Sequence, residues 1–157
     1  MKRILQLAAL GAVLATPVAA APSPDWQRYS NPESGLSVDI PTAIFERDAG
    51  PAESGPGRKF VTSDGRANLT VQTVANPRGD TPAAFLAAKG PPSGIVYRRV
   101  TKTFFVVSSF RDDKIWYNRC NFAGRAAHCV LINYPAREKA RWDGIVTRLS
   151  RSLRSGS

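Results

Sequence analysis

The segment RCNFAGRAAHC, residues 119–129, constrains the fold most strongly, because it contains both cysteines and the only histidine of the chain. If Gly124 and Arg125 form a type II′ turn, which requires glycine first, facing residues have numbers that sum to 249. Cys120 then faces Cys129 in a pair without backbone hydrogen bonds, where α-carbons approach to about 4.5 Å. That separation allows a disulfide. The segment therefore predicts a disulfide-closed β-hairpin rather than two reactive thiols.

The same register decides how His128 is interpreted. It places His128 opposite Asn121, on the face of the sheet away from the disulfide, where it cannot easily activate either sulfur. A zinc site needs three or four convergent ligands, and the disulfide removes two candidates, so we predict no metal and no cofactor. Ser108 and Ser109 lie at a strand end without a nucleophile-elbow motif. We expect His128 to be a strand residue bonded locally; the alternative is a hydrolase that uses it with a nearby hydroxyl.

The first twenty residues have the pattern of a secretory signal: a positive start, an apolar run and a small-residue end. Val18 and Ala20 favour cleavage before Ala21. The alternative, an uncleaved membrane anchor, is disfavoured because polar residues and a proline interrupt a run barely long enough to span a bilayer. We therefore predict a signal peptide, residues 1–20, and one periplasmic or secreted domain, residues 21–157, without a transmembrane segment.

The first part of this domain is predicted to contain four short strands separated by turns. The glycine- and proline-rich segment DAGPAESGPGR, residues 48–58, is predicted to be a loop. A two-residue turn at Asp64 and Gly65 predicts a hairpin. That turn sets Phe60 opposite Leu69.

Two segments are predicted to be helices. Thr81 as N-cap, Pro82 in the first turn and Gly90 just past the end indicate a short helix. A last helix begins near Pro135, and its apolar residues recur at helical spacing. This predicted buried stripe consists of Trp142, Ile145, Val146, Leu149 and Leu153.

Four more strands are predicted between the two helices. The strand that contains Phe104 to Val107 is apolar at consecutive positions, which is typical of a central strand in a sheet covered on both faces. The element order is therefore ββββ-α-ββββ-α. This order predicts an α+β fold, with an antiparallel sheet covered by helices as an α/β/α sandwich.

Basic residues gather in the second half of the domain. Residues 21–97 contain seven basic and eight acidic residues, whereas residues 98–157 contain thirteen and four. At 100° per residue, four arginines of the predicted last helix lie within about 80° of its circumference. They form either a basic ridge that binds a partner or a face that is simply solvated. The excess favours an anionic partner, whether protein, lipid or glycan, over nucleic acid, because no recognition motif is visible. The predicted binding residues are Arg137, Arg141, Arg148, Arg151, Arg98, Arg99 and Lys102.

Two short motifs and the order of the elements resemble the PsbP-like group of exported accessory proteins. The motifs are YSNPESGLSVDIP, residues 29–41, and RLSRSLR, residues 148–154. The resemblance covers most of the domain and implies an α/β/α sandwich with a non-enzymatic role in assembling or stabilising a partner. The metal-associated histidines of photosynthetic members have no evident counterpart, since His128 is alone. No functional residue is carried over.

Together these observations predict an exported, non-catalytic binding or accessory domain. It would engage an anionic partner through a basic C-terminal face. A small exported hydrolase that uses His128 is the alternative.

Overall fold

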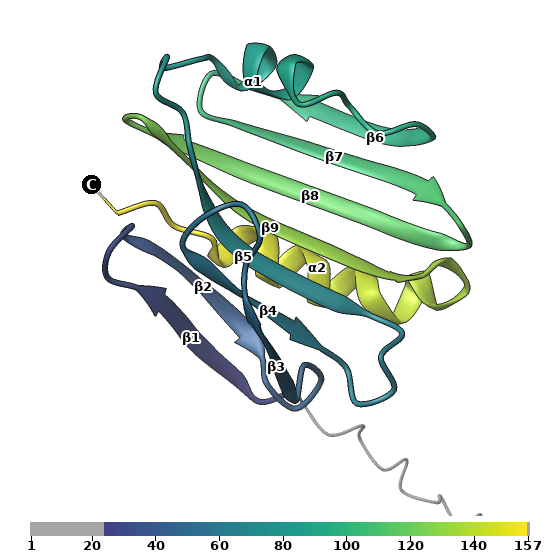
Figure 1. Ribbon diagram of the computed structural model, residues 1–157. Helices are drawn as coiled ribbons and strands as arrows, with labels where there is room; N and C mark the ends of the chain where they lie inside the picture. Colours follow the sequence, from purple (N-terminus) through teal and green to yellow (C-terminus); the bar gives the residue numbers. More distant parts are fainter. Residues whose placement is uncertain (1–23, 157) are drawn as a thin grey trace, which may run out of the picture.

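The computed structural model describes residues 24–156, which form three layers around a seven-stranded antiparallel sheet (Figure 1). The α+β fold predicted from the sequence is thereby confirmed, whereas the predicted signal peptide lies outside the described residues. The strand order in the sheet is β3-β4-β5-β9-β8-β7-β6. These strands are β3 (Arg47–Pro51), β4 (Gly57–Val61), β5 (Asn68–Ala75), β6 (Ile95–Val100), β7 (Phe104–Arg111), β8 (Lys114–Ala123) and β9 (Ala126–Pro135).

One face of the sheet is covered by helix α2 (Lys139–Ser152) together with a separate hairpin of β1 (Trp26–Asn31) and β2 (Leu36–Pro41). The predicted apolar stripe of α2 is buried in this larger core, as expected from its helical spacing. The β2 residues and α2 also share a hydrogen bond, from the Asp39 amide to Ser152 Oγ at 2.9 Å. The hairpin and α2 therefore act as one layer.

The opposite face carries the short helix α1 (Pro82–Ala88), which packs Phe85 and Leu86 over a second, smaller core. The caps are those predicted: Thr81 Oγ1 accepts the Ala84 amide at 3.2 Å, and Gly90 follows the end with φ of 69°. At about 1.5 Å per residue, a helix of 7 residues covers only part of this face.

The cysteine hairpin has the predicted register. Cys120 pairs with Cys129, and the two form a disulfide with α-carbons 4.1 Å apart. Gly124 adopts the positive φ of 55° that the turn requires. The predicted pairing of Phe60 with Leu69 is likewise confirmed.

Two strand predictions were wrong. The segment predicted as a loop begins with β3, so five strands precede α1 and the order is βββββ-α-ββββ-α. The sequence signal was absent because β3 is an exposed edge strand with a bulge at Gly50, held partly by the 2.6 Å ion pair between Asp48 and Arg58. The apolar strand β7 is second from the edge, not central.

The last helix also starts later than predicted. Strand β9 runs to Pro135, and a 3₁₀ turn (Ala136–Glu138) follows before α2 begins at Lys139. A 3₁₀ turn has about three residues per turn, so it breaks the 100° spacing on which the predicted ridge depended. Arg137 therefore does not lie on α2.

Candidate functional site

His128 is a buried strand residue in the predicted position. It faces Asn121 in the register and is 2 % exposed, with Nδ1 3.0 Å from Thr73 Oγ1. Burial lowers the pKa of the imidazole. Ser109 lies on the other face of the sheet, and Ser108 pairs with Tyr117, four positions along β8 from the residue that faces His128, so neither serine forms a unit with His128. The hydrogen bond to Thr73 satisfies Nδ1 of His128, and the burial of the side chain leaves a substrate no access to it.

The structure removes Arg137 from the predicted ridge, whereas Arg141, Arg148 and Arg151 all lie on α2. Arg141 contacts Glu138 at 3.7 Å, and Arg137 lies in the 3₁₀ turn instead of on the helix. Arg148 stacks over the ring of Trp26, with Cζ 4.3 Å from the ring centroid. The basic residues of this region therefore serve several local contacts.

The remaining predicted binding residues are divided between the two faces of the sheet. Arg98 pairs with Val107, on the α1 side, whereas Arg99 faces the α2 side. Lys102 lies in the turn between β6 and β7. The predicted residues consequently do not make one continuous surface, and Arg99 is the one that joins a cluster on the sheet.

Arg99, Arg119 and Arg154 form this cluster, which we call the arginine patch. In the register, Arg99 and Arg119 flank Val106 from the neighbouring strands. Both guanidinium groups lie over the ring of Phe104, with Cζ at 5.5 Å and 4.3 Å from its centroid. The two arginines therefore share one aromatic surface on β7.

Arg154 joins the patch from the segment after α2. Its backbone pairs with Ser37 in both directions, at 3.1 and 2.8 Å, which fixes the position of the residue. Its Nη1 donates to the Arg151 carbonyl at 2.6 Å, at the helix end where cations are favoured. Arg151, in the last turn of α2, is itself exposed.

The electrostatics of the patch are unusual because none of the described residues supplies a counterion. No carboxylate of residues 24–156 lies within 4.0 Å of any of its three guanidinium groups. Arg119 is half-buried and donates to Ser150 Oγ at 3.2 Å and Asn121 Oδ1 at 3.0 Å. Burial lowers the pKa of Arg119, and the charges of Arg99 and Arg154 lower it further.

Aromatic residues surround the patch. Tyr97 is 50 % exposed on β6, whose outer edge is unpaired in the described sheet. The Tyr117 hydroxyl donates to Ser150 Oγ at 2.6 Å, and burial raises the pKa of this phenol. Arginine and tyrosine side chains of this kind are enriched in the centres of protein interfaces.

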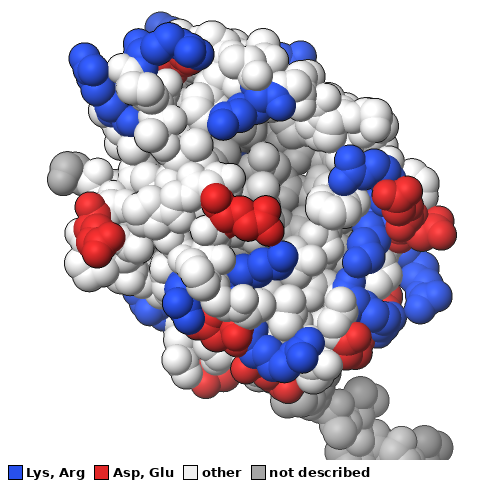
Figure 2. All heavy atoms as spheres, in the orientation of Figure 1, with Lys and Arg blue, Asp and Glu red and all other residues white. Residues whose placement is uncertain are grey.

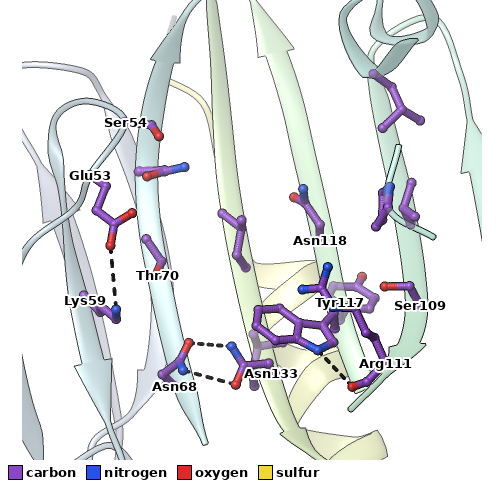
Figure 3. Close-up of a pocket in the computed structure, with 17 residues that line it drawn as sticks. Glu53, Ser54, Lys59, Asn68, Thr70, Ser109, Arg111, Tyr117, Asn118 and Asn133 are labelled. Atoms are coloured by element: carbon purple, nitrogen blue, oxygen red, sulfur yellow. Dashed lines mark hydrogen bonds and ion pairs between the residues drawn. The ribbon is translucent and has the colours of Figure 1, made fainter. Parts of the chain in front are cut away.

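A groove of about 470 Å³ lies on the other face of the sheet, beside α1. Strands β4, β5, β9, β8 and β7 form its floor, and Glu53 and Ser54 border it from the loop before β4 (Figure 3). The space-filling view shows this face hollowed near its centre, with both basic and acidic groups around the hollow (Figure 2). Asn68 and Asn133 exchange two amide hydrogen bonds across the floor, at 3.1 and 2.7 Å (Figure 3).

Sequence reasoning missed both Arg119 and the groove, although a signal for each was present. Arg119 differs by one position from Cys120, so the hairpin register already placed it on the face away from the disulfide. In β5 the polar residues Asn68, Thr70 and Gln72 alternate with buried apolar residues, which indicates a polar face on that strand.

Residues 24–156 contain no group of three or more histidine, cysteine, aspartate or glutamate side chains that could hold a metal ion. Within the same range, no helix is both long and apolar enough to cross a membrane.

No protein-family model and no curated protein matches this sequence. Among solved structures, the solution structure of cyanobacterial PsbP (CyanoP) from Synechocystis sp. PCC 6803 is similar, with a TM-score of 0.64. The match covers 89 % of this chain and 98 % of that chain, at 10 % sequence identity. At this identity the likeness concerns the backbone arrangement. The chain therefore has a PsbP-like fold, as the motifs and the element order predicted.

Proposed function

We propose that this protein is an exported, non-catalytic accessory domain that binds an acidic protein partner through the arginine patch. The observation that carries the proposal is the cluster of Arg99, Arg119 and Arg154. The first two lie over the ring of Phe104, and none of the three has a carboxylate within ion-pair distance among the described residues. Neighbouring like charges repel unless an anion compensates them. A carboxylate of a partner would supply that compensation and form charge-assisted hydrogen bonds.

The surroundings of the patch favour a protein over a lipid or a glycan as the anionic partner. Exposed Tyr97 and half-buried Phe104 offer rigid apolar area beside the charges, as interface centres do. Arg119 is already partly desolvated, and hydrogen bonds to Ser150 and Asn121 hold its side chain. The free-energy cost of desolvating and ordering this side chain on binding is therefore lower than for a fully exposed arginine. Arg148 and Arg151 would extend the basic surface along α2.

Export and the accessory role have separate support. A disulfide is typical of proteins from oxidising compartments, which agrees with the predicted signal peptide. The resemblance to the PsbP-like group implies an accessory role. The hydrolase alternative has less support, because His128 and Thr73 are both buried and bonded to each other.

The test is crosslinking in the native compartment followed by mass spectrometry, comparing wild type with the Arg99→Gln/Arg119→Gln variant. We expect the variant to lose the crosslinked acidic protein by at least about tenfold, since two charge-assisted contacts are removed. Arg98→Gln is the matched control, because Arg98 is equally exposed on the same strand but faces the opposite side of the sheet. It should capture as much partner as wild type.

Two results would contradict the proposal. One is a folded double variant that captures the partner as well as wild type does. The other is binding of wild type to vesicles containing phosphatidylglycerol, or to a sulfated glycan, with no acidic protein captured in the compartment. An Arg137→Gln/Arg141→Gln variant, included in the same experiment, measures the contribution of the first half of the predicted ridge.

A further inference from the structure

We propose that the groove on the α1 side of the sheet is a second binding site, and that it takes a neutral saccharide. This site lies on the opposite face from the arginine patch and is independent of the function proposed for that patch. Its residues come mainly from alternate positions of β5, β9, β8 and β7, so they are held by the rigid sheet rather than by loops.

The first observation is that buried polar side chains of the groove lack partners. Gln72 is 8 % exposed and Ser109 is 1 % exposed, and both line the groove. Within residues 24–156, neither side chain makes a hydrogen bond. Among the described residues, Ser34 Oγ is the only fully enclosed side-chain polar atom without a partner, so the polar atoms of Gln72 and Ser109 are still open to the groove. Water or a ligand in the groove can therefore reach these two side chains and bond to them.

A third polar group, the amide of Asn118, is also free. Its Oδ1 lies 3.5 Å from Cys120 Sγ, but a disulfide sulfur carries no hydrogen to donate. The paired amides of Asn68 and Asn133 keep one N–H each after their mutual hydrogen bonds. The floor of the groove thus presents several groups that donate and accept.

This set matches hydroxyl groups better than it matches ions. An amide or a hydroxyl both donates and accepts, and each hydroxyl of a sugar does the same. An anion would accept only and leave the amide oxygens unpaired, and a cation would leave the amide N–H groups unpaired. The groove is therefore complementary to a ligand with many hydroxyl groups.

The charges at the groove do not call for a charged ligand. Lys59 Nζ lies 3.9 Å from Glu53 at the rim (Figure 3). Arg111 lies 3.6 Å from Asp112 and stacks on the Trp116 ring, with Cζ 4.6 Å from the centroid. Lys59 and Arg111, the two cations that line the groove, therefore each have a carboxylate within ion-pair distance. The guanidinium groups of the arginine patch have none among the described residues.

Apolar groups complete the match. Half-buried Leu131 and Trp116 line the groove between the polar side chains and offer surface to the C–H faces of a sugar ring, whereas Val107 and Leu86 are buried beneath it. The volume falls within the usual range of small-ligand sites, about 300–1,000 Å³. From β5 to β7 the floor crosses three inter-strand spacings of about 4.8 Å, or roughly 14 Å, enough for a short oligosaccharide.

The experiment is a titration of the full chain with neutral trisaccharides of glucose and of N-acetylglucosamine, followed by two-dimensional ¹⁵N–¹H spectra. We expect at least one of them to shift the side-chain amide signals of Gln72 and Asn118 and the indole signal of Trp116. Gln72→Met keeps the length of the side chain and removes its hydrogen bonds, so affinity should fall about tenfold. Ser109→Ala, the milder change, should weaken binding less.

Gln27→Met is the matched control, because Gln27 is an exposed glutamine of β1, outside the groove. It should bind the sugar as wild type does. The proposal fails if neither trisaccharide shifts the groove signals, or if folded Gln72→Met and Ser109→Ala bind as tightly as wild type. It also fails if trigalacturonate, or a neutral serine- and glycine-containing pentapeptide, binds the groove more tightly than the neutral sugars, since the site would then be selective for anions or for polypeptide.

Discussion

The two faces of the seven-stranded sheet carry opposite chemistry although the same strands build both. Strand β8 contributes Arg119 to the arginine patch and Trp116 and Asn118 to the groove. One face gathers positive charge without described counterions, and the other gathers neutral groups that donate and accept. The difference shows that alternation along a single strand is enough to place two unlike surfaces about one sheet thickness apart. The two surfaces should therefore respond to different perturbations.

The largest effect is expected from the disulfide between Cys120 and Cys129, because it joins β8 to β9 and both strands contribute to the two faces of the sheet. Replacing both Cys120 and Cys129 by alanine should lower the free energy of unfolding by about 2–3 kcal/mol, because the disulfide closes a short loop, with a sequence separation of 9. Urea denaturation of the variant and of reduced wild type measures the loss, which should be similar in both. Unchanged stability would show that the backbone pairing alone holds β8 against β9.

A difference in salt response should separate the faces. Raising NaCl from about 0.05 to about 0.5 M should weaken binding of the acidic partner to the arginine patch about tenfold, or about 1.4 kcal/mol, because exposed charges are screened. Binding of the neutral trisaccharide in the groove should stay within about twofold. Calorimetric titrations at both salt concentrations give, for each of the two ligands, the ratio of its dissociation constants at high and low salt. Equal ratios would remove the electrostatic distinction between the faces.

The smallest effect is expected from His128, which lies on the same face as the arginine patch. Burial holds the pKa of His128 below its ordinary value of 6.5, so below that pH the unfolded chain takes up a proton that the folded chain does not. The free energy of unfolding should therefore fall as the pH is lowered from about 6.5 toward the folded-state pKa. The stability that neutral His128 contributes is fully present above pH 6.5 and is lost as the pH falls from 6.5 through the folded-state pKa.

The measurement compares the change in melting temperature between about pH 7.5 and pH 5 for wild type and for His128→Gln. The change should be smaller in the variant, because glutamine does not titrate. Comparing changes instead of absolute values removes any general loss of stability in the variant. An identical change in the two proteins would mean that other groups produce the acid sensitivity.

Local patterns predicted those parts of the fold that local residues determine. The turn at Gly124 fixed the pairing of Cys120 with Cys129, and the caps of α1 were readable from Thr81 and Gly90. Strand β3 was missed because it is an exposed edge strand without apolar alternation. In each successful case, residues a few positions apart carried the signal.

The arginine patch and the groove could not be read in this way. The patch joins β6, β8 and the segment after α2, and it exists only because β7 lies between the two strands and Arg154 pairs with Ser37. The groove depends on how little of its face α1 covers. The predicted ridge extended helical spacing back to Arg137, which lies in a 3₁₀ turn before α2. The alternation in β5 indicates a polar face on that strand, but long-range strand pairing decides which strands and loops meet at the groove.

The packing of the β1–β2 hairpin on α2 has a consequence for the order of folding. The hairpin is made first during synthesis, yet its hydrogen bond from Asp39 reaches Ser152, 113 residues later, and its apolar side is covered by the last helix. Contacts so distant along the chain form slowly, because a long loop must close before they stabilise anything. The earliest-made hairpin is therefore among the last parts to acquire its native neighbours, and until α2 emerges its apolar residues remain open to water and to chaperones.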